Sequence, residues 1–270
     1  MKRFFCILFA CLFLCGCSVT VQEMTHDIDR GNAPGAETSE PTTGPTLPEN
    51  PYGPLDFGFE GDYLACFAGE YALGIDVSYW QGQIDWQQVK DAGIEYAIVR
   101  VGQRGSEQGT IAEDQMARQY YQEASAVGLK LGAYFFSQAI SVEEAVEEAN
   151  FVLDIIRDWH LEMPVVFDWE YYSDTARTAN MDARTLTDCT IAFCDTIKSA
   201  GFTPMVYFNI EQARNLVHLE ELTDYKFWLA MYDTSMTYAH KIDMWQYSCT
   251  GSVPGITGDV DLNLYFTYEG

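Results

Sequence analysis

The sequence predicts an α/β fold, an incomplete (β/α) barrel with eight strands and about five helices, over residues 72–270. Short runs rich in β-branched and aromatic residues recur along this stretch, and amphipathic helical segments separate the early runs. This alternation is typical of parallel strands joined by helices, and eight strands are enough to close a barrel. The last three runs are joined by connections with little room for helices, so the last third of the domain should be irregular.

The predicted strands are apolar runs of the length expected for buried strands. Each is followed by polar or turn-forming residues. In chain order they span residues 73–77, 96–102, 131–136, 164–169, 204–209, 226–232, 242–248 and 259–265.

Helix signals lie between the early strands. Asp85 is a predicted N-cap, because a Gln follows at the third helical position and a Gly follows the helical segment. Longer amphipathic segments span 112–127, 141–158 and 183–200, and each is bounded by a capping Ser or a terminal Gly. A weaker helix is expected after Asn209.

Several charged, thiol and aromatic residues have a structural interpretation. The glutamates at 143–144 and 147–148 are expected on a solvated helix face. The cysteines outside the N-terminal segment are expected to be mostly small buried hydrophobes, namely Cys66, Cys189, Cys194 and Cys249. Four tryptophans are expected in the core or the barrel wall, namely Trp80, Trp86, Trp159 and Trp228.

The N-terminus has the pattern of a targeting segment. Lys2 and Arg3 precede an apolar run that is too short for an ordinary spanning helix, which predicts a signal peptide over residues 1–16. The run ends in Leu-Cys-Gly-Cys17, which resembles a bacterial lipobox. That resemblance implies that Cys17 becomes lipidated and that the protein is a cell-membrane lipoprotein outside the cytoplasm, facing the wall. The alternative is an uncleaved or ordinarily cleaved signal.

The segment that follows is predicted to be a tether. Residues 17–55 are rich in Pro, Thr, Gly and Glu and cannot bury a core. Residues 56–71 are transitional, with a short helix or a strap on the domain edge as the expectation. The barrel domain then occupies residues 72–270.

Charge and ligand chemistry exclude some functions. The chain has 15 Lys+Arg against 40 Asp+Glu, a net charge of −25. Nucleic acid is therefore not expected as a partner, because phosphate binding needs a basic face. The four His are scattered and no CxxC pair occurs, so no metal site and no cofactor are expected.

Polar residues follow the predicted strands where a (β/α) barrel carries its chemistry, at the C-terminal strand ends. The expected rim residues are Asp76, Tyr134, Asp168, Glu170, Tyr207, Asn209, Tyr232, Trp245, Gln246 and Asp261. Asp261 lies early in its strand, so its height in the barrel stays open. Acids and aromatics without a basic residue have the composition of a site that hydrolyses sugars.

Asp168 and Glu170 are the most informative pair. They lie two positions apart on a strand, so their side chains share a face while Trp169 points the other way. Two close carboxylates cannot both ionise easily, so one pKa should rise and provide a general acid near neutral pH. Glu170 is longer and nearer the rim and is expected to be the proton donor. The alternative is that these acids cap the next turn.

Several motifs occur together and in order: "GIDVSYWQGQIDW" from residue 74, "FDWE" from 167, "MVYFN" from 205, "WLAMY" from 228, "MWQYS" from 244 and "DVDLN" from 259. They resemble glycoside hydrolase family 25, the bacterial and phage muramidases, over essentially all of residues 72–270. The resemblance implies a barrel of eight strands and five helices. It also implies hydrolysis of the β-1,4 bond between N-acetylmuramic acid and N-acetylglucosamine in peptidoglycan glycan strands.

The resemblance also implies roles for individual residues. Glu170 matches the catalytic acid, Asp168 its partner, and Asp76 and Asp261 the other acids of the cleft. Sugar-binding rim positions match Tyr134, Tyr207, Tyr232 and Gln246. Many members have His after the tyrosine of the third strand, whereas this chain has Phe135 after Tyr134, so contacts on that side should differ.

Two questions stay open at this level. Hydrolysis could be assisted by the substrate's own 2-acetamido group, oriented by Asp168, or could invert the anomeric centre with Asp76 or Asp261 activating water. The favoured function is a lipid-anchored muramidase of cell-wall catabolism or remodelling. The alternatives are a catalytically inactive wall-glycan-binding lipoprotein and, more weakly, a hydrolase of another glycan such as chitin.

Overall fold

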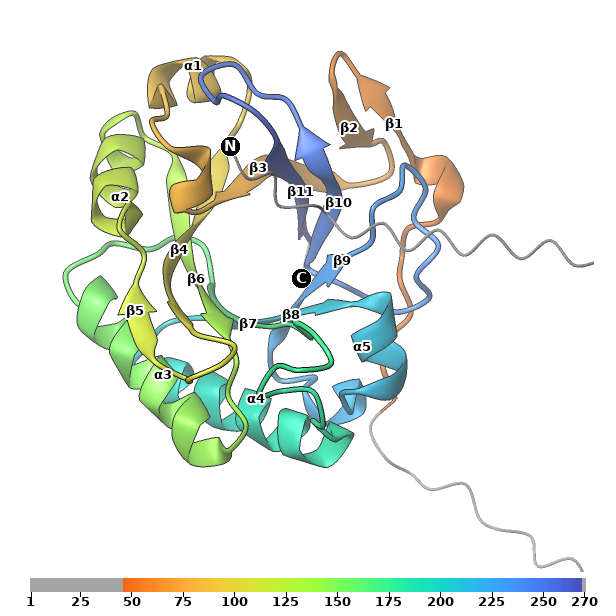
Figure 1. Ribbon diagram of the computed structural model, residues 1–270. Coiled ribbons are helices and arrows are strands. Elements are labelled where there is room, and N and C mark those ends of the chain that lie inside the picture. Colours follow the sequence, from red (N-terminus) through yellow and green to blue (C-terminus); the bar gives the residue numbers. More distant parts are fainter. Residues whose placement is uncertain (1–45, 269–270) are drawn as a thin grey trace, which may run out of the picture. The chain divides into compact units, whose positions relative to one another are not determined.

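Eight strands close into a barrel in the computed structural model, which describes residues 46–268 (Figure 1). The ring runs β3, β4, β6, β7, β8, β9, β10, β11 and back to β3. Their bounds are β3 (Glu70–Val77), β4 (Tyr96–Arg104), β6 (Lys130–Ser137), β7 (Val165–Trp169), β8 (Pro204–Asn209), β9 (Lys226–Ala230), β10 (Met244–Gly251) and β11 (Val260–Thr267). The predicted α/β barrel of eight strands is confirmed.

Five α-helices of the described region accompany the barrel, as predicted, and Figure 1 shows them outside the ring. They are α1 (Trp86–Asp91), α2 (Ala117–Ala126), α3 (Val142–Ile156), α4 (Ala183–Ser199) and α5 (Ile210–Asn215), with short 3-10 helices η1 (Pro54–Asp56), η2 (Tyr79–Gln81) and η3 (Leu219–Glu221). Side-chain oxygens cap the first N–H groups of four of them, from Asp85, Ser141, Asp182 and Asn209. No helix within residues 46–268 has the length and apolar character needed to cross a membrane.

The last strand departs from the predicted parallel sheet. β11 pairs antiparallel with both β10 and β3. The prediction was wrong for this strand because residues 252–259 are too few for the crossover that parallel strands need, so β10 and β11 form a hairpin. The beginning of β11 therefore meets the C-terminal ends of the other strands, and Asp261 lies directly opposite Asp76.

The second helix begins later than predicted. Residues Ile111–Glu113 form β5, which pairs with the end of β4 at Gly102–Arg104, and α2 starts only at Ala117. The helical pattern over 112–127 extended too far because an edge of β4 was open for pairing, and tertiary pairing overrides local propensity.

A β-hairpin covers the side of the barrel that has no helix. β1 (Phe57–Glu60) and β2 (Tyr63–Cys66) pair across a turn at Gly61 and lie beside β10 and β11 in Figure 1. The Phe57 ring packs edge-on against Trp245 at 5.0 Å. The Leu64 N–H donates to the Tyr247 hydroxyl at 3.4 Å. The transitional segment is thus a pair of strands, where the sequence indicated a helix or strap.

The end of the predicted linker is attached to the barrel domain. Glu49 forms a β-bridge with His240, and Leu47 packs against the core. The predicted signal peptide, Cys17 and the linker up to residue 45 lie outside the described residues.

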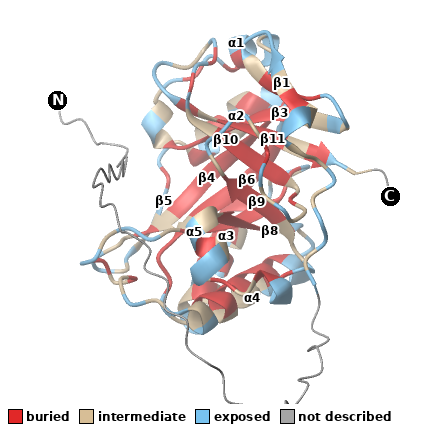
Figure 2. Cartoon of the chain, turned by 90° about the vertical axis from the view of Figure 1, so that its right-hand side faces the viewer, coloured by how far each residue is buried: buried red, intermediate tan, exposed pale blue. Residues whose placement is uncertain are grey.

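Buried residues form two layers separated by the sheet. The outer layer lies between the strands and the helices, and Figure 2 shows buried residues following the strands and the inner sides of the helices. The inner layer fills the barrel with large side chains, including Tyr96, Met205, Trp228 and Met244. A Cβ at Gly74 would lie 2.2 Å from the Tyr96 ring, so glycine is required where this ring crosses the barrel.

A buried ion-pair cluster joins α3 to β4 and β6. Glu148 is fully buried, accepts from Arg104 Nε at 2.7 Å and from the Ser137 hydroxyl at 2.6 Å. Arg104 also pairs with Glu147, which is exposed. The prediction of a solvated face was wrong for Glu148, because the buried Arg104 guanidinium requires a carboxylate beside it.

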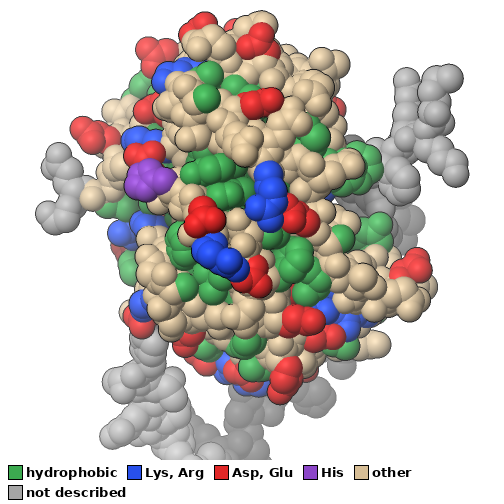
Figure 3. Space-filling model, turned by 90° about the vertical axis from the view of Figure 1, so that its left-hand side faces the viewer, with side chains coloured by type: hydrophobic (Ala, Val, Ile, Leu, Met, Phe, Trp, Pro, Cys, Tyr) green, Lys and Arg blue, Asp and Glu red, His purple; other side chains and the backbone are tan. Residues whose placement is uncertain are grey.

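Basic and acidic side chains mix on the face shown in Figure 3, which lies at the left of Figure 1. Several basic side chains of the described residues are in ion pairs, such as Arg118 with Glu113 at 2.7 Å. This face therefore has no basic patch that would attract a polyanion.

Candidate active site

A cleft of about 240 Å³ opens at the C-terminal ends of the barrel strands. It brings together eight of the ten predicted rim residues, namely Asp76, Tyr134, Asp168, Glu170, Tyr207, Tyr232, Gln246 and Asp261. The sequence did not anticipate six further residues that line it, namely Val77, Ser78, Trp80, Gln81, Arg100 and Phe136. Trp228, expected in the core or the barrel wall, closes the bottom.

The end of β7 carries the central pair of acids. Trp169 is buried outside the barrel and donates its indole N–H to the Ala139 carbonyl at 3.2 Å, which leaves Asp168 and Glu170 on the cleft side, as predicted. Two buried amides hold the backbone here. Gln138 donates to the Glu170 carbonyl at 2.7 Å, and Gln212 donates to the Trp169 carbonyl at 2.5 Å.

The Asp168 and Glu170 carboxyls interact directly, and both pKa values are raised. Burial is the main cause for each, and for Asp168 repulsion by Glu170 and Asp76 adds to it. The pKa of Glu170 rises to about 7. Asp168 Oδ1 is buried and accepts no hydrogen bond, so nothing fully compensates a charge there. The pair therefore retains a shared proton near neutral pH.

Asp76 is the acid that is best held as an anion. Its Oδ2 accepts from Gln246 Nε2 at 2.9 Å and from Asn263 Nδ2 at 2.8 Å. The Gln246 Oε1 accepts from the Tyr207 and Tyr232 hydroxyls, both at 3.1 Å, which fixes the amide orientation. Burial raises the pKa of Asp76 to about 6, and the two amide donors oppose that rise.

Asp261 lies opposite Asp76 on β11 and has a different environment. Burial, together with the negative charges of Asp76 and Glu170, raises the pKa of Asp261 to about 9. Asp261 is therefore protonated near neutral pH and can donate a hydrogen bond into the cleft.

Arg100 corrects the expectation that no basic residue lies among the acids. It lies on β4, is buried, and pairs with Asp114 at 2.9 Å while its guanidinium lies 5.0 Å from the Tyr79 ring centroid. Its charge lowers the pKa of Asp168, against the larger effect of burial. The sequence did contain a signal for this. Arg100 lies two positions after Ile98, which packs in the barrel interior, and residues two apart on a strand share a face.

Trp80 was expected in the core or the barrel wall, but it lines the cleft with 65% of its surface exposed. The short η2 helix after β3, capped by Ser78, carries it to the rim, where an indole has no core to enter. An exposed aromatic side chain beside a set of acids is an available stacking surface for a sugar ring.

Two predicted rim residues lie elsewhere. Trp245 is fully buried in the outer layer and donates to the Met231 carbonyl, because Gln246 points into the cleft and neighbouring residues of a strand face opposite sides. Asn209 does not line the cleft. Its side chain caps α5 by accepting the Gln212 N–H at 3.0 Å, so the end of β8 serves the next helix instead.

Carboxylates and imidazole also come together on η3. His218, Glu220 and Glu221 are the one grouping in residues 46–268 with the spacing of metal ligands. None of the three lines the cleft, and Glu221 is already paired with Arg184 at 2.7 Å. This exposed grouping has no connection to the site.

Comparisons with known proteins agree with this geometry. The sequence profile described as "Glycosyl hydrolases family 25" matches residues 75–256. Lysozyme M1 of Streptomyces globisporus is 26% identical over 202 residues, which are 71% of this chain and 67% of that one. A bacterial lysozyme of Streptomyces coelicolor has a similar structure, with a TM-score of 0.61, 25% identity and coverage of 73% of this chain and 92% of that one.

A modular autolysin has a similar fold. The structure of LytC from Streptococcus pneumoniae, solved with a synthetic peptidoglycan ligand, is similar with a TM-score of 0.65 at 24% identity. The match covers 73% of this chain and 47% of LytC, so this chain spans about half the length of that protein.

Proposed function

Because the chain belongs to glycosyl hydrolases family 25, we propose that it is a muramidase, which cleaves the β-1,4 bond between N-acetylmuramic acid and N-acetylglucosamine in peptidoglycan. The observation that carries the proposal is the convergence of Asp76, Asp168, Glu170 and Asp261 in one cleft with exposed aromatic side chains. Similarity to lysozymes that are 25–26% identical to this chain over the aligned residues supports the same bond as the target.

Glu170 is the proposed proton donor to the bridging oxygen. It is less buried than Asp168 and has the longer side chain, and its pKa of about 7 keeps a proton available near neutral pH. Asp168 is held behind it by the end of β7. The Gln138 and Gln212 bonds to the backbone fix both carboxyls relative to the cleft.

Substrate assistance is the proposed mechanism. In it the 2-acetamido oxygen attacks the anomeric carbon while Glu170 protonates the leaving oxygen, and Asp168 orients the acetamido group. Asp261 is a poor base for the inverting alternative, because its pKa of about 9 keeps it protonated. Asp76 is the candidate base in that alternative. Both of its side-chain donors bind Oδ2, so its other carboxylate oxygen, Oδ1, can accept from a water molecule.

The stereochemistry of the first product tests the mechanism. NMR of a fresh digest should show the β-anomer retained at the new reducing end. An initially inverted product would rule out substrate assistance.

The bond specificity tests the function itself. Mass spectrometry of peptidoglycan digested by the purified protein should find fragments that end in N-acetylmuramic acid. Fragments that end in N-acetylglucosamine would contradict the proposal, and so would the absence of any release. In Glu170→Gln, kcat should fall by about 10³-fold because general-acid catalysis is lost, while Glu143→Gln on the exposed face of α3 serves as the matched control.

We also propose that the protein is a lipoprotein of the cell membrane that faces the wall, with Cys17 as the lipidated residue. The support is the sequence pattern before Cys17 and the Pro- and Thr-rich stretch after it. Metabolic labelling with palmitate should mark the native protein and leave Cys17→Ala unlabelled. Equal absence of label from both proteins would refute the anchor without touching the enzymatic proposal.

A further inference from the structure

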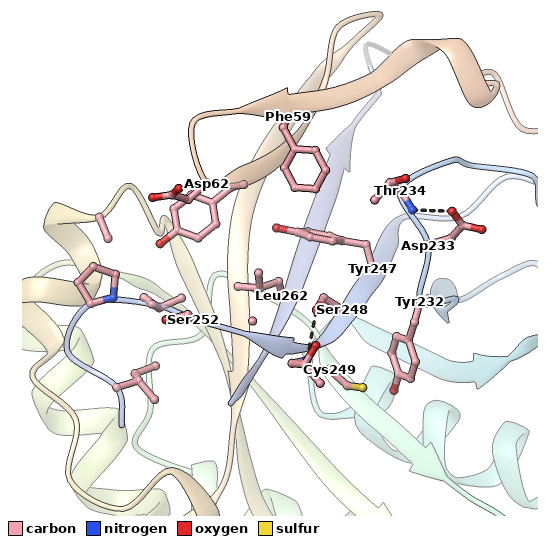
Figure 4. A pocket seen from close by; sticks show the side chains of 17 residues that line it. Phe59, Asp62, Tyr232, Asp233, Thr234, Tyr247, Ser248, Cys249, Ser252 and Leu262 are labelled. Atoms are coloured by element: carbon pink, nitrogen blue, oxygen red, sulfur yellow. Dashed lines mark hydrogen bonds between the residues drawn. The ribbon is translucent and has the colours of Figure 1, made fainter. Parts of the chain in front are cut away.

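A second cavity, larger than the cleft, lies on the outer side of β10 (Figure 4). Its volume is about 1020 Å³. Most of its lining comes from the β1–β2 hairpin, the segment after β9, and β10 with the connection to β11; Ala92 and Leu262 complete it. We call it the hairpin groove and define it by Phe59, Asp62, Tyr232, Thr234, Tyr247 and Ser252.

We infer that the hairpin groove binds further N-acetylhexosamine units of the glycan strand whose bond is cleaved in the cleft; this rests on the proposed function. The first reason is continuity. Tyr232 lines both cavities and is 56% exposed, and its hydroxyl bonds Gln246, the residue that holds Asp76. A strand leaving the cleft over Tyr232 enters the groove directly.

The lining has the chemistry that a sugar chain requires. Phe59 points into the groove from the hairpin, and Figure 4 shows the Tyr247 ring below it. Phe59 is 60% exposed, an apolar surface that the described residues leave uncovered. Hydroxyl groups of Thr234 and Ser252 lie on the other walls. Aromatic faces match the C–H faces of pyranose rings, and hydroxyls match their polar edges.

Charge favours the glycan over the peptides that branch from it. The charged residues of the lining are Asp62 and Asp233, and no Lys or Arg is among them. Stem peptides carry carboxylates, which these acids would repel at short range. N-acetylglucosamine units carry no charge, and an N-acetylmuramic acid unit carries none while its lactyl carboxyl is held in an amide bond, so these sugar rings are not repelled in such a groove. Asp233 is in addition bound by the N–H groups of Thr234 and Ser235.

The hairpin wall is preformed and lies outside the family match. Residues 57–66 precede residue 75, where that match begins. The hairpin is held to β10 by the Leu64 bond to the Tyr247 hydroxyl and by the Phe57 contact with Trp245. No large loop has to close before a glycan strand can occupy the groove. The groove should therefore increase the affinity for strands that are long enough to reach it.

Calorimetric titration of the inactive Glu170→Gln protein tests the inference, with peptide-free glycan strands of increasing length whose lactyl carboxyls are converted to amides. Affinity should rise once a strand is long enough to pass Tyr232 and reach the groove. Adding Phe59→Ala should weaken binding of long strands about tenfold, as expected for loss of an anchoring aromatic residue. Ser252→Trp, which fills the groove instead, should do the same. Phe67→Ala is the matched control, because Phe67 follows the same hairpin, is 66% exposed and lies outside the groove.

Three outcomes would overturn the inference. One is an affinity that does not depend on strand length, and another is equal binding of long strands by the parent and both groove variants. The third is a loss of affinity that appears only when the strands carry stem peptides, which would make the peptide the occupant. Muropeptide release by the wild-type protein reports separately on the proposed function, so the inference can fail while that function stands.

Discussion

At the scale of single residues, the acids of the cleft differ because their neighbours differ. Asp76 receives two amide hydrogen bonds, Asp261 receives none from a side chain and faces Asp76, and Glu170 interacts with Asp168. Burial raises the pKa of each, to about 6, about 9 and about 7 respectively. Environments that separate the pKa values of like groups allow one to act as an acid while another stays ionised.

The pH dependence of kcat/KM should therefore be bell-shaped, with its maximum between about 6 and 7. Glu170 must be protonated, so activity falls as the pH rises through its pKa of about 7. An ionised Asp76 is expected to stabilise the positive charge that develops on the sugar in the transition state, so activity falls as the pH drops through its pKa of about 6. Initial rates on solubilised peptidoglycan across this range measure both limbs.

A variant assigns the acidic limb. Asn263→Leu removes one of the donors that lower the pKa of Asp76, so the acidic limb should move to higher pH while the alkaline limb stays in place. Movement of the alkaline limb instead, or of neither limb, would mean that Asp76 does not set the acidic side.

Trp80 should contribute to substrate binding more than to the chemical step. Trp80→Ala removes an exposed indole from the cleft, and we expect KM to rise about fivefold to tenfold with kcat nearly unchanged. Steady-state kinetics on soluble glycan fragments measure both constants, with Phe67→Ala as an exposed aromatic control. A large fall in kcat at constant KM would indicate that Trp80 acts on the transition state.

At the scale of elements, helices and strands position the site through buried polar contacts. β7 ends in two carbonyls that accept from Gln138, just after β6, and from Gln212 of α5. Behind them, Arg177 bridges the Gln138 carbonyl and the Glu144 carboxylate of α3. Each contact comes from a different element, so the placement of the acids depends on the helices being packed.

The ion-pair cluster between α3 and the barrel should be a major determinant of stability. Glu148→Leu leaves the buried Arg104 guanidinium without one of its two carboxylates, and the free energy of unfolding should fall by about 3 kcal/mol. Urea denaturation followed by circular dichroism measures the change. Glu143→Ala on the exposed face of the same helix should change it by less than about 0.5 kcal/mol. A Glu148→Leu protein as stable as this control would mean that Glu147 alone satisfies Arg104.

At the scale of the whole molecule, net charge opposes encounter with an anionic wall. Removal of a signal peptide with Lys2 and Arg3 would leave 13 basic against 40 acidic side chains, a net charge of −27. A lipid anchor with a long tether would offset this repulsion by raising the effective concentration of the domain near its substrate.

Anchored protein should therefore lyse or remodel whole cells faster than a soluble form truncated before residue 46, at equal amounts. On isolated, solubilised peptidoglycan the two forms should have equal rates, which controls for folding. Equal rates on whole cells as well would show that the anchor does not contribute to substrate access.

Much of the fold could be predicted from the sequence because it depends on local patterns. The eight strands appear as apolar runs, and Asp85 and Ser141 cap their helices as their spacing predicts. Side chains of a strand alternate between its two faces. Asp168 and Glu170 could therefore be placed on the same face of β7 from their positions in the chain.

Tertiary structure decided what depends on partners distant in sequence. The antiparallel pairing of β11 brings Asp261 to the rim, the Arg104 guanidinium draws Glu148 into the interior, and the β1–β2 hairpin covers Trp245. The local sequence determines the periodicity of a segment. Closure of the barrel determines which surface that segment packs against. That physical difference explains why the acids of the cleft could be named in advance and the groove beside them could not.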